Sequence, residues 1–206
     1  MQDNTKAYTF KEYVINESVD QDESGVRLFC DMDGVLTDFD RGFKRMKLNH
    51  DHLTPDEYND KHGHQSIWQL IDQRGIKFWK RLPWMKDGRA LWDYIQRYKP
   101  IILSSPSRSK DSVIGKLDWL KLNLGINEKD PVRKSSEMKD DTRVIFSNHK
   151  EDFATGKNDV LIDDKKSNIE KWVAAGGTGI LHTDATDSIR LLESIVSKNS
   201  ETEDIQ

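Results

Sequence analysis

The apolar residues of the chain gather in five short runs, separated by longer stretches in which apolar positions recur with helical spacing. The runs are 26–30 (VRLFC), 100–104 (PIILS), 143–146 (RVIF), 159–162 (DVLI) and 178–182 (TGILH). Each run is short and rich in Val, Ile, Leu or Phe, which is typical of a strand that is buried on both faces. We therefore predict five strands at these positions.

The stretches between these runs predict helices at about 88–98, 111–124, 167–175 and 187–197. The second of them is followed by Gly125 and the third by Gly176, and glycine commonly ends helices. A regular alternation of strands and helices predicts an α/β, Rossmann-like fold, in which a parallel sheet carries helices on both faces. Ligands of such sheets bind beyond the carboxyl ends of the strands.

One segment, residues 41–86, interrupts the alternation because it contains helical signals but no convincing strand. Thr54 followed by Pro55 predicts the start of one helix, and 65–82 (QSIWQLIDQRGIKFWKRL) predicts two more that are broken at Gly75. Because the segment directly follows the first strand, we predict a small helical cap over the carboxyl edge of the sheet. The predicted parts are a polar N-terminal extension (1–25), an α/β core (26–40 and 87–198), the cap (41–86) and a disordered tail (199–206).

The composition narrows the classes of function. A net charge of −4 argues against a surface that coats nucleic acid, although a few local cations can still dominate a pocket for a small anion. Cys30 is the only cysteine, so no disulfide can form within the chain and a reducing compartment is expected. No signal-peptide pattern or run of about 20 apolar residues is present, so we expect a cytoplasmic protein with no membrane contact. Nothing in the sequence predicts the oligomeric state.

Two of the predicted strands end in paired acids, Asp31-Met32-Asp33 and Asp163-Asp164. In one parallel sheet these four carboxylates would meet at one edge, where two unit charges roughly 4 Å apart repel by about 4 kcal/mol at an effective dielectric of 20. A cation would remove that cost, and a ligand set made only of oxygen atoms favours Mg²⁺. Taken alone, each pair could equally be a solvated turn.

A calcium loop of the EF-hand type is a further alternative for the first pair, but it requires glycine at the sixth position and glutamate at the twelfth. Counted from Asp31, glycine falls at the fourth position and the twelfth residue is Gly42. The sequence therefore excludes an EF-hand here.

Four segments together carry a resemblance to a known family. They are DMDGVLTDF (31–39), IILSSPS (101–107), Lys150 and LIDD (161–164). In order and spacing they resemble the four motifs of the haloacid dehalogenase superfamily. Other segments, among them FWKRLPWMKDGRALWDYI and LIDDKKSNIEKWVAAGGTGILH, are similar to the type C 5′(3′)-deoxyribonucleotidases and their short phage-encoded relatives.

The resemblance implies a role for each motif residue. Asp31 would be the nucleophile that attacks phosphorus, and Asp33 would be the general acid and base, with its backbone carbonyl on Mg²⁺. Ser104 would bind a phosphoryl oxygen beside the backbone N–H of Ser105, and Lys150 would neutralise the charge on the transferred group. Dehalogenases lack the second aspartate and P-type ATPases carry threonine there, so Asp33 favours a phosphatase.

The remaining site residues follow from the same resemblance. Gly34 would let the backbone turn tightly beside the phosphate, and Lys116 matches a second lysine of the nucleotidase pattern. Which of the two lysines is the main phosphate ligand stays open. Asp164 would ligate the metal directly, while Asp163 would support it through hydrogen bonds.

Aromatic residues of the cap would select the substrate. Phe39 aligns with an aromatic residue that stacks on the nucleobase in the resembling nucleotidases, and Phe43 and Trp79 are further candidates for substrate binding. Aromatics at helical spacing are nevertheless often core residues. The histidines at 50, 52, 62 and 64 could suggest a second metal site, but their irregular spacing favours solvated side chains.

The sequence therefore predicts a Mg²⁺-dependent phosphomonoesterase that acts on nucleoside monophosphates, with 5′-deoxyribonucleotides favoured. Two alternatives stay open. The first is a phosphatase for another small phosphoester or for a nucleic-acid 3′-phosphate end, although the acidic balance of the chain argues against binding of nucleic acid. The second is a protein that binds a nucleotide or a partner without turnover.

Overall fold

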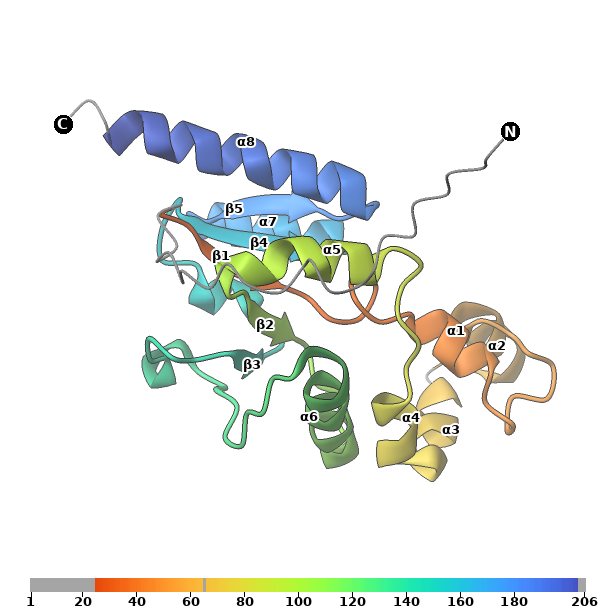
Figure 1. Cartoon of the computed structure of the whole chain (residues 1–206). Coiled ribbons are helices and arrows are strands. Elements are labelled where there is room, and N and C mark those ends of the chain that lie inside the picture. Colours follow the sequence, from red (N-terminus) through yellow and green to blue (C-terminus); the bar gives the residue numbers. More distant parts are fainter. Residues whose placement is uncertain (1–24, 65, 204–206) are drawn as a thin grey trace, which may run out of the picture.

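The structure is a computed structural model that describes residues 25–64 and 66–203 (Figure 1). The polar N-terminal extension predicted at 1–25 falls outside the described residues except for Gly25. Among the helices of the described ranges, none is long and apolar enough to cross a membrane.

The core is a single sheet of five parallel strands, as predicted. The strands are β1 (Arg27–Cys30), β2 (Ile101–Ser104), β3 (Val144–Phe146), β4 (Asp159–Asp163) and β5 (Thr178–Leu181). Their order across the sheet is β3-β2-β1-β4-β5, so the two strands that end in paired acids are neighbours. Cys30 pairs with Ile162, which brings the ends of β1 and β4 to the same level of the sheet.

Helices cover both faces of this sheet, and the alternation of side chains along the strands explains why (Figure 1). Leu28 and Cys30 pack in a cluster with α5 (Gly88–Ile95), α6 (Lys110–Leu124) and α8 (Ala185–Glu203). Phe29 points to the other face and packs against Trp172 of α7 (Lys166–Ala174), at 5.0 Å between ring centroids. The Rossmann-like fold class predicted from the sequence is therefore confirmed.

Four short helices follow β1 in place of a strand, and Figure 1 shows them together beyond the carboxyl edge of the sheet. They are α1 (Phe39–Lys44), α2 (Pro55–His62), α3 (Ser66–Arg74) and α4 (Ile76–Lys80). Thr54 caps α2 by accepting a hydrogen bond from the Glu57 backbone N–H, and Gly75, at φ +59°, separates α3 from α4. The helical cap has the form predicted, while its exact limits as a separate domain remain a prediction.

The C-terminal end of the chain differs from the sequence-based expectation. Helix α8 continues to Glu203, so the disordered tail predicted at 199–206 is wrong for 199–203. The remaining elements are single 3₁₀ turns, η1 (Gln96–Tyr98), η2 (Ser135–Glu137) and η3 (Lys150–Phe153). The last of these turns carries Lys150 and lies just beyond β3, next to the candidate site.

Candidate active site

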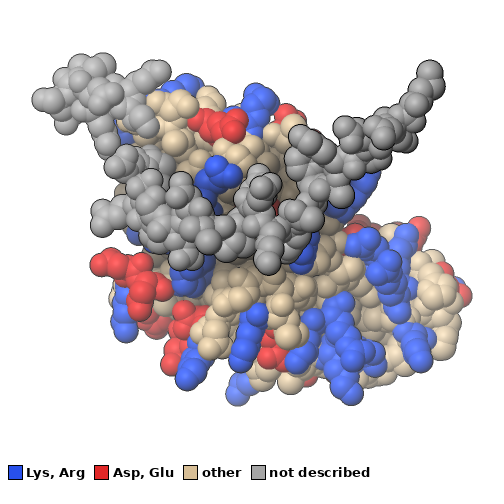
Figure 2. Space-filling model, in the orientation of Figure 1, with Lys and Arg blue, Asp and Glu red and all other residues tan. Residues whose placement is uncertain are grey.

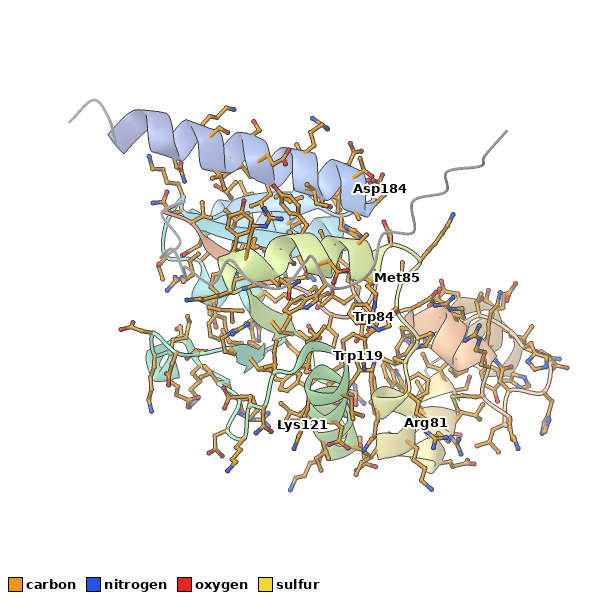
Figure 3. All side chains as sticks on the ribbon, in the orientation of Figure 1. Arg81, Trp84, Met85, Trp119, Lys121 and Asp184 are labelled. Atoms are coloured by element: carbon orange, nitrogen blue, oxygen red, sulfur yellow. The ribbon has the colours of Figure 1, made fainter. Side chains whose placement is uncertain are left out.

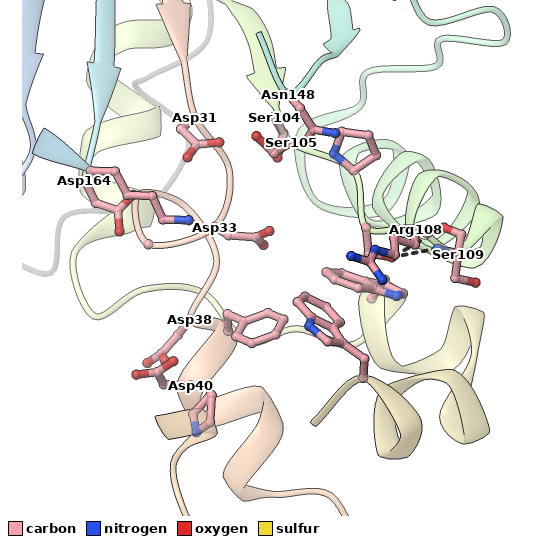
Figure 4. A pocket seen from close by; sticks show the side chains of 18 of the residues that line it. Asp31, Asp33, Asp38, Asp40, Ser104, Ser105, Arg108, Ser109, Asn148 and Asp164 are labelled. Atoms are coloured by element: carbon pink, nitrogen blue, oxygen red, sulfur yellow. Dashed lines mark hydrogen bonds between the residues drawn. The ribbon is translucent and has the colours of Figure 1, made fainter. Parts of the chain in front are cut away.

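The carboxylates that follow β1 and β4 converge, as the order of the strands requires. One oxygen atom from each of Asp31, Asp163 and Asp164 lies within 4.8 Å of the others. Figure 4 shows Asp31 and Asp164 facing the same space, with Asp33 on the loop below them. Two separate strands therefore deliver a compact group of acids to one point.

The surroundings of Asp164 fit a bound cation best. Its Oδ1 atom is buried and has no hydrogen-bond partner among the residues that the structure describes. Burial, together with the charges of Asp31 and Asp163, raises the pKa of the Asp164 carboxyl to about 6. A buried, unpartnered carboxylate oxygen beside two other carboxylates fits a hard divalent cation such as Mg²⁺.

The loop after β1 is built around Gly34, which adopts a φ of +85°. A Cβ atom at this position would lie 2.3 Å from Asp164 Oδ2, so only glycine fits between the two acidic segments. The loop is closed by a hydrogen bond from the Gly34 N–H to the Thr37 carbonyl, at 2.8 Å. The tight turn predicted at Gly34 thus serves chiefly to admit Asp164.

Lys150 lies inside the acidic group. Its Nζ is 2.9 Å from Asp31 Oδ1 and 2.5 Å from Asp163 Oδ2, and the side chain is almost fully buried. Burial lowers the pKa of Lys150, but Asp31 and Asp163 raise it by more, so the net direction is upward and the ammonium stays charged. Burial raises the pKa of Asp31, and the Lys150 charge offsets part of that rise.

Asp163 is held mainly by protein donors. Besides Lys150, its carboxylate accepts hydrogen bonds from the Asn168 side-chain amide, at 2.9 and 3.0 Å, and from the Lys165 backbone N–H, at 2.8 Å. Few of its lone pairs remain free for a cation, whereas Asp164 Oδ1 is unpartnered. This contrast agrees with a direct ligand role for Asp164 and a supporting role for Asp163.

A second buried lysine, Lys116 of α6, links the remaining motif residues. Its Nζ donates hydrogen bonds to Asp33 Oδ2 at 2.6 Å, to Ser104 Oγ at 2.9 Å and to the Ser105 carbonyl at 2.9 Å. The other oxygen of Asp33 accepts a hydrogen bond from the Thr37 hydroxyl, at 2.8 Å. Both oxygens of the Asp33 carboxylate are therefore held by hydrogen bonds. Lys116 pairs with Asp33, whereas Lys150 pairs with Asp31.

These groups open into a cavity of about 1170 Å³ between the sheet edge and the cap. Asp31, Asp33, Gly34, Ser104, Ser105 and Asp164 line its inner end, while Phe39, Trp68, Trp79 and Arg108 line the outer part. The Phe39 ring lies 5.8 Å from the Trp79 ring and 6.3 Å from the Trp68 ring, centroid to centroid. Trp79 is only 2% exposed, so it contributes more to packing than to the open surface of the cavity.

Phe43 does not reach this cavity, which corrects its predicted role in substrate binding. Its side chain is fully buried and packs against Tyr58 of α2, with ring centroids 5.4 Å apart. Although Phe39 and Phe43 both lie on α1, the later residue sits one turn further from the sheet edge, where α2 covers it. Phe43 is therefore a core residue of the cap.

Several residues of the site were missed from the sequence. Thr37 orients Asp33 and Asn168 holds Asp163, and both lie close to the motif aspartates in the chain. Asn148 and Arg108 line the cavity from the loops after β3 and β2. Asn148 and Arg108 could have been predicted from their position just after a strand, because the loops that follow the strands of a parallel sheet face the ligand site.

Comparison with known proteins adds little to this geometry. No family profile and no curated protein matches the chain. Among solved structures, a hydrolase from Streptococcus pneumoniae TIGR4 is similar, with a TM-score of 0.49 and 10% sequence identity over 81% of this chain and 97% of that chain. A likeness at this level says nothing about reaction or substrate.

Proposed function

We propose that the protein is a Mg²⁺-dependent phosphomonoesterase that hydrolyses nucleoside monophosphates, with 5′-deoxyribonucleotides as the favoured substrates. The observation that carries this proposal is the unpartnered Asp164 oxygen, within 4.8 Å of Asp31 and Asp163 at the inner end of a large cavity. Asp31, Asp164 and the backbone carbonyl of Asp33 would hold the ion. When bound, Mg²⁺ would lower the repulsion between a substrate phosphate and these carboxylates.

The chain's own residues supply the chemistry. Asp31 attacks phosphorus through a carboxylate oxygen, forming an aspartyl-phosphate as the bond to the leaving oxygen breaks; an ionised carboxylate needs no base for this step. Asp33 gives its proton to the leaving oxygen and then takes one from the water that cleaves the intermediate. Lys116 and Thr37 hold the Asp33 carboxyl in place for both transfers.

The phosphoryl oxygens would be bound by donors around the inner end of the cavity. Ser104 and Ser105 line this end after β2, where the Ser104 hydroxyl and the Ser105 backbone N–H would bind phosphoryl oxygens, and Lys150 lies beside Asp31. A cationic donor fixed in advance stabilises the charge that develops on the transferred group. The outer aromatic residues, led by Phe39, would receive the nucleoside.

A phosphate-release screen over nucleoside monophosphates, sugar phosphates and 3′-phosphorylated oligonucleotides, with Mg²⁺ present, tests the proposal. We expect turnover of mononucleotides that EDTA stops and Mg²⁺ restores. Asp31→Asn should abolish turnover while the far-ultraviolet circular dichroism stays unchanged. Preference for another phosphoester would replace the substrate class, and nucleotide binding without any phosphate release would indicate a non-catalytic binding protein.

A further inference from the structure

The outer surfaces of the cap, of the start of α5 and of α6 carry a group of cations that the proposed reaction does not use. It consists of Lys77, Lys80, Arg81, Arg89 and Lys121, which we call the basic strip. All five side chains are exposed. Figure 2 shows Lys and Arg gathered over the lower part of the molecule, where α4 and α6 lie. The strip is unexpected in a chain with a net charge of −4.

Close packing of α4 on α6 brings together the two helices that carry most of the strip. A Cβ atom on Gly115 would lie 2.5 Å from Trp79 Cβ, so glycine is needed where the two helices meet. Beyond that point the Lys80 ammonium lies 2.9 Å from Asp118, and the Trp84 indole N–H donates to Asn123 Oδ1 at 3.1 Å. Residues 80–84 therefore run alongside residues 118–123.

The remaining cations lie near the contact between α4 and α6, which we call the α4–α6 seam. Arg81 and Lys121 lie at the same lower level in Figure 3, on α4's end and on α6. The Arg89 guanidinium lies over the Trp84 ring, 5.0 Å from its centroid. The strip is thus a group of exposed cations on α4 and its end, on the start of α5 and on α6, beside the α4–α6 seam.

The strip carries an excess of positive charge. Among the described residues, Lys80 is its only member that forms an ion pair, and Asp118 is the partner. Asp87, the acid nearest to Arg89 in the chain, accepts a hydrogen bond from the Ala185 backbone N–H at 2.6 Å instead. Four cations are therefore left to bind an anion, and several separate cations suit a polymer of anions better than a single anion.

Two apolar side chains of α6 are also exposed. Leu122 is 66% exposed and Ile114 46% exposed, both on the outer face of α6. Single-stranded nucleic acid presents phosphates and unpaired bases together, so it can use cations and apolar surface at once. A duplex hides its bases, and a membrane surface would call for a broader apolar face than two side chains that lie two helical turns apart.

We propose that the basic strip binds single-stranded nucleic acid along the α4–α6 seam. The strand's phosphates lie on Lys77, Arg81, Lys121 and Arg89, and its bases rest against the exposed apolar side chains of α6. None of these residues takes part in the proposed hydrolysis, so this binding does not depend on that reaction.

Fluorescence anisotropy with a labelled oligothymidylate tests the strip, in EDTA so that no turnover can occur. About four phosphate contacts predict that raising the salt from 50 to 200 mM weakens binding about 50-fold. The variant Lys77→Ala/Arg81→Ala/Lys121→Ala should bind at least tenfold more weakly and show a salt slope smaller by about 2. The matched control Lys139→Ala/Lys157→Ala/Lys171→Ala removes three exposed lysines outside the strip and should bind normally.

Four results would overturn the inference. They are failure of the wild-type protein to bind at 50 mM salt, equal loss in both triple variants, equal binding of duplex DNA, and strip-dependent binding to phosphatidylserine vesicles alone. Circular dichroism shows whether each variant is folded. Hydrolysis of a mononucleotide should be the same in the strip variant as in the wild type, so the two proposals can fail separately.

Discussion

Replacing Asp164 by asparagine tests the central electrostatic feature of the site. The amide has nearly the shape of the carboxylate, so it fits beside Gly34 but carries no charge. We expect Asp164→Asn to stabilise the metal-free protein and, at the same time, to remove its stabilisation by Mg²⁺. These opposite effects of one substitution separate a metal site from an ordinary structural carboxylate.

The magnitude follows from the pKa of Asp164, which rises from 3.8 to about 6 on folding. A pKa raised by folding means that the full stability is present below pH 3.8 and is lost as the pH rises through about 6. At 1.36 kcal/mol for each pKa unit the loss would be about 3 kcal/mol, and screening of this partly exposed group reduces it to about 1–1.5 kcal/mol. The variant should gain that amount at pH 7.5 and almost nothing at pH 4.

Urea unfolding, followed by tryptophan fluorescence, measures both effects. In EDTA at pH 7.5 the variant should have the higher free energy of unfolding. With Mg²⁺ at a hundredfold excess over its dissociation constant, the wild-type protein should gain about 2.7 kcal/mol and the variant much less. Asp130→Asn, which changes an exposed acid in a loop far along the chain from these motifs, serves as the control and should leave both quantities unchanged.

Two outcomes would refute the reasoning. If the metal-free Asp164→Asn protein were less stable than the wild type, the Asp164 carboxylate would be stabilised by favourable contacts, not destabilised by burial and by the neighbouring charges. Equal stabilisation of both proteins by Mg²⁺ would place the ion elsewhere.

Three further predictions concern the cavity, the loop and the core. Phe39→Ala should raise KM for nucleotides at least tenfold more than KM for glycerol phosphate, and steady-state kinetics showing equal effects would make the ring purely structural. Gly34→Ala places a methyl group 2.3 Å from Asp164 Oδ2 at a φ of +85°, so it should cost about 1–3 kcal/mol in urea unfolding and weaken Mg²⁺ binding; a neutral effect on both would show that the loop can relax. Burial lowers the pKa of His182, so stability should be complete above pH 6.5 and fall as the pH drops below it; His182→Gln should flatten this dependence, and an unchanged pH profile of unfolding would contradict it.

The strands could be predicted because their signal is local. All five apolar runs became strands of one parallel sheet, and each paired acid follows a strand as expected. Sequence alone does not state which strands are neighbours. The meeting of Asp31 with Asp164 depends on β1 lying beside β4, and this order is visible only in the folded chain.

The sequence-based predictions that were wrong or incomplete also have physical causes. Phe43 is aromatic and lies shortly after the first acidic motif, as a cavity residue would. Its burial depends on α2, a helix that starts more than ten residues later in the chain. Helix α8 continues through the polar residues 199–203, where no apolar periodicity marks it. Arg108 and Asn148 have no motif of their own, and only the fold brings their loops to the cavity.

The two buried lysines set the order in which ligands can enter the site. Among the described residues, the ammonium groups that form ion pairs with Asp31, Asp33 and Asp163 are those of Lys116 and Lys150, and Asp164 forms no ion pair. When all four acids are ionised, these two pairings leave two negative charges, which would repel the phosphate dianion of the proposed substrate and attract a divalent cation. Cation first, substrate second is therefore the sequence of binding that this balance of charges favours.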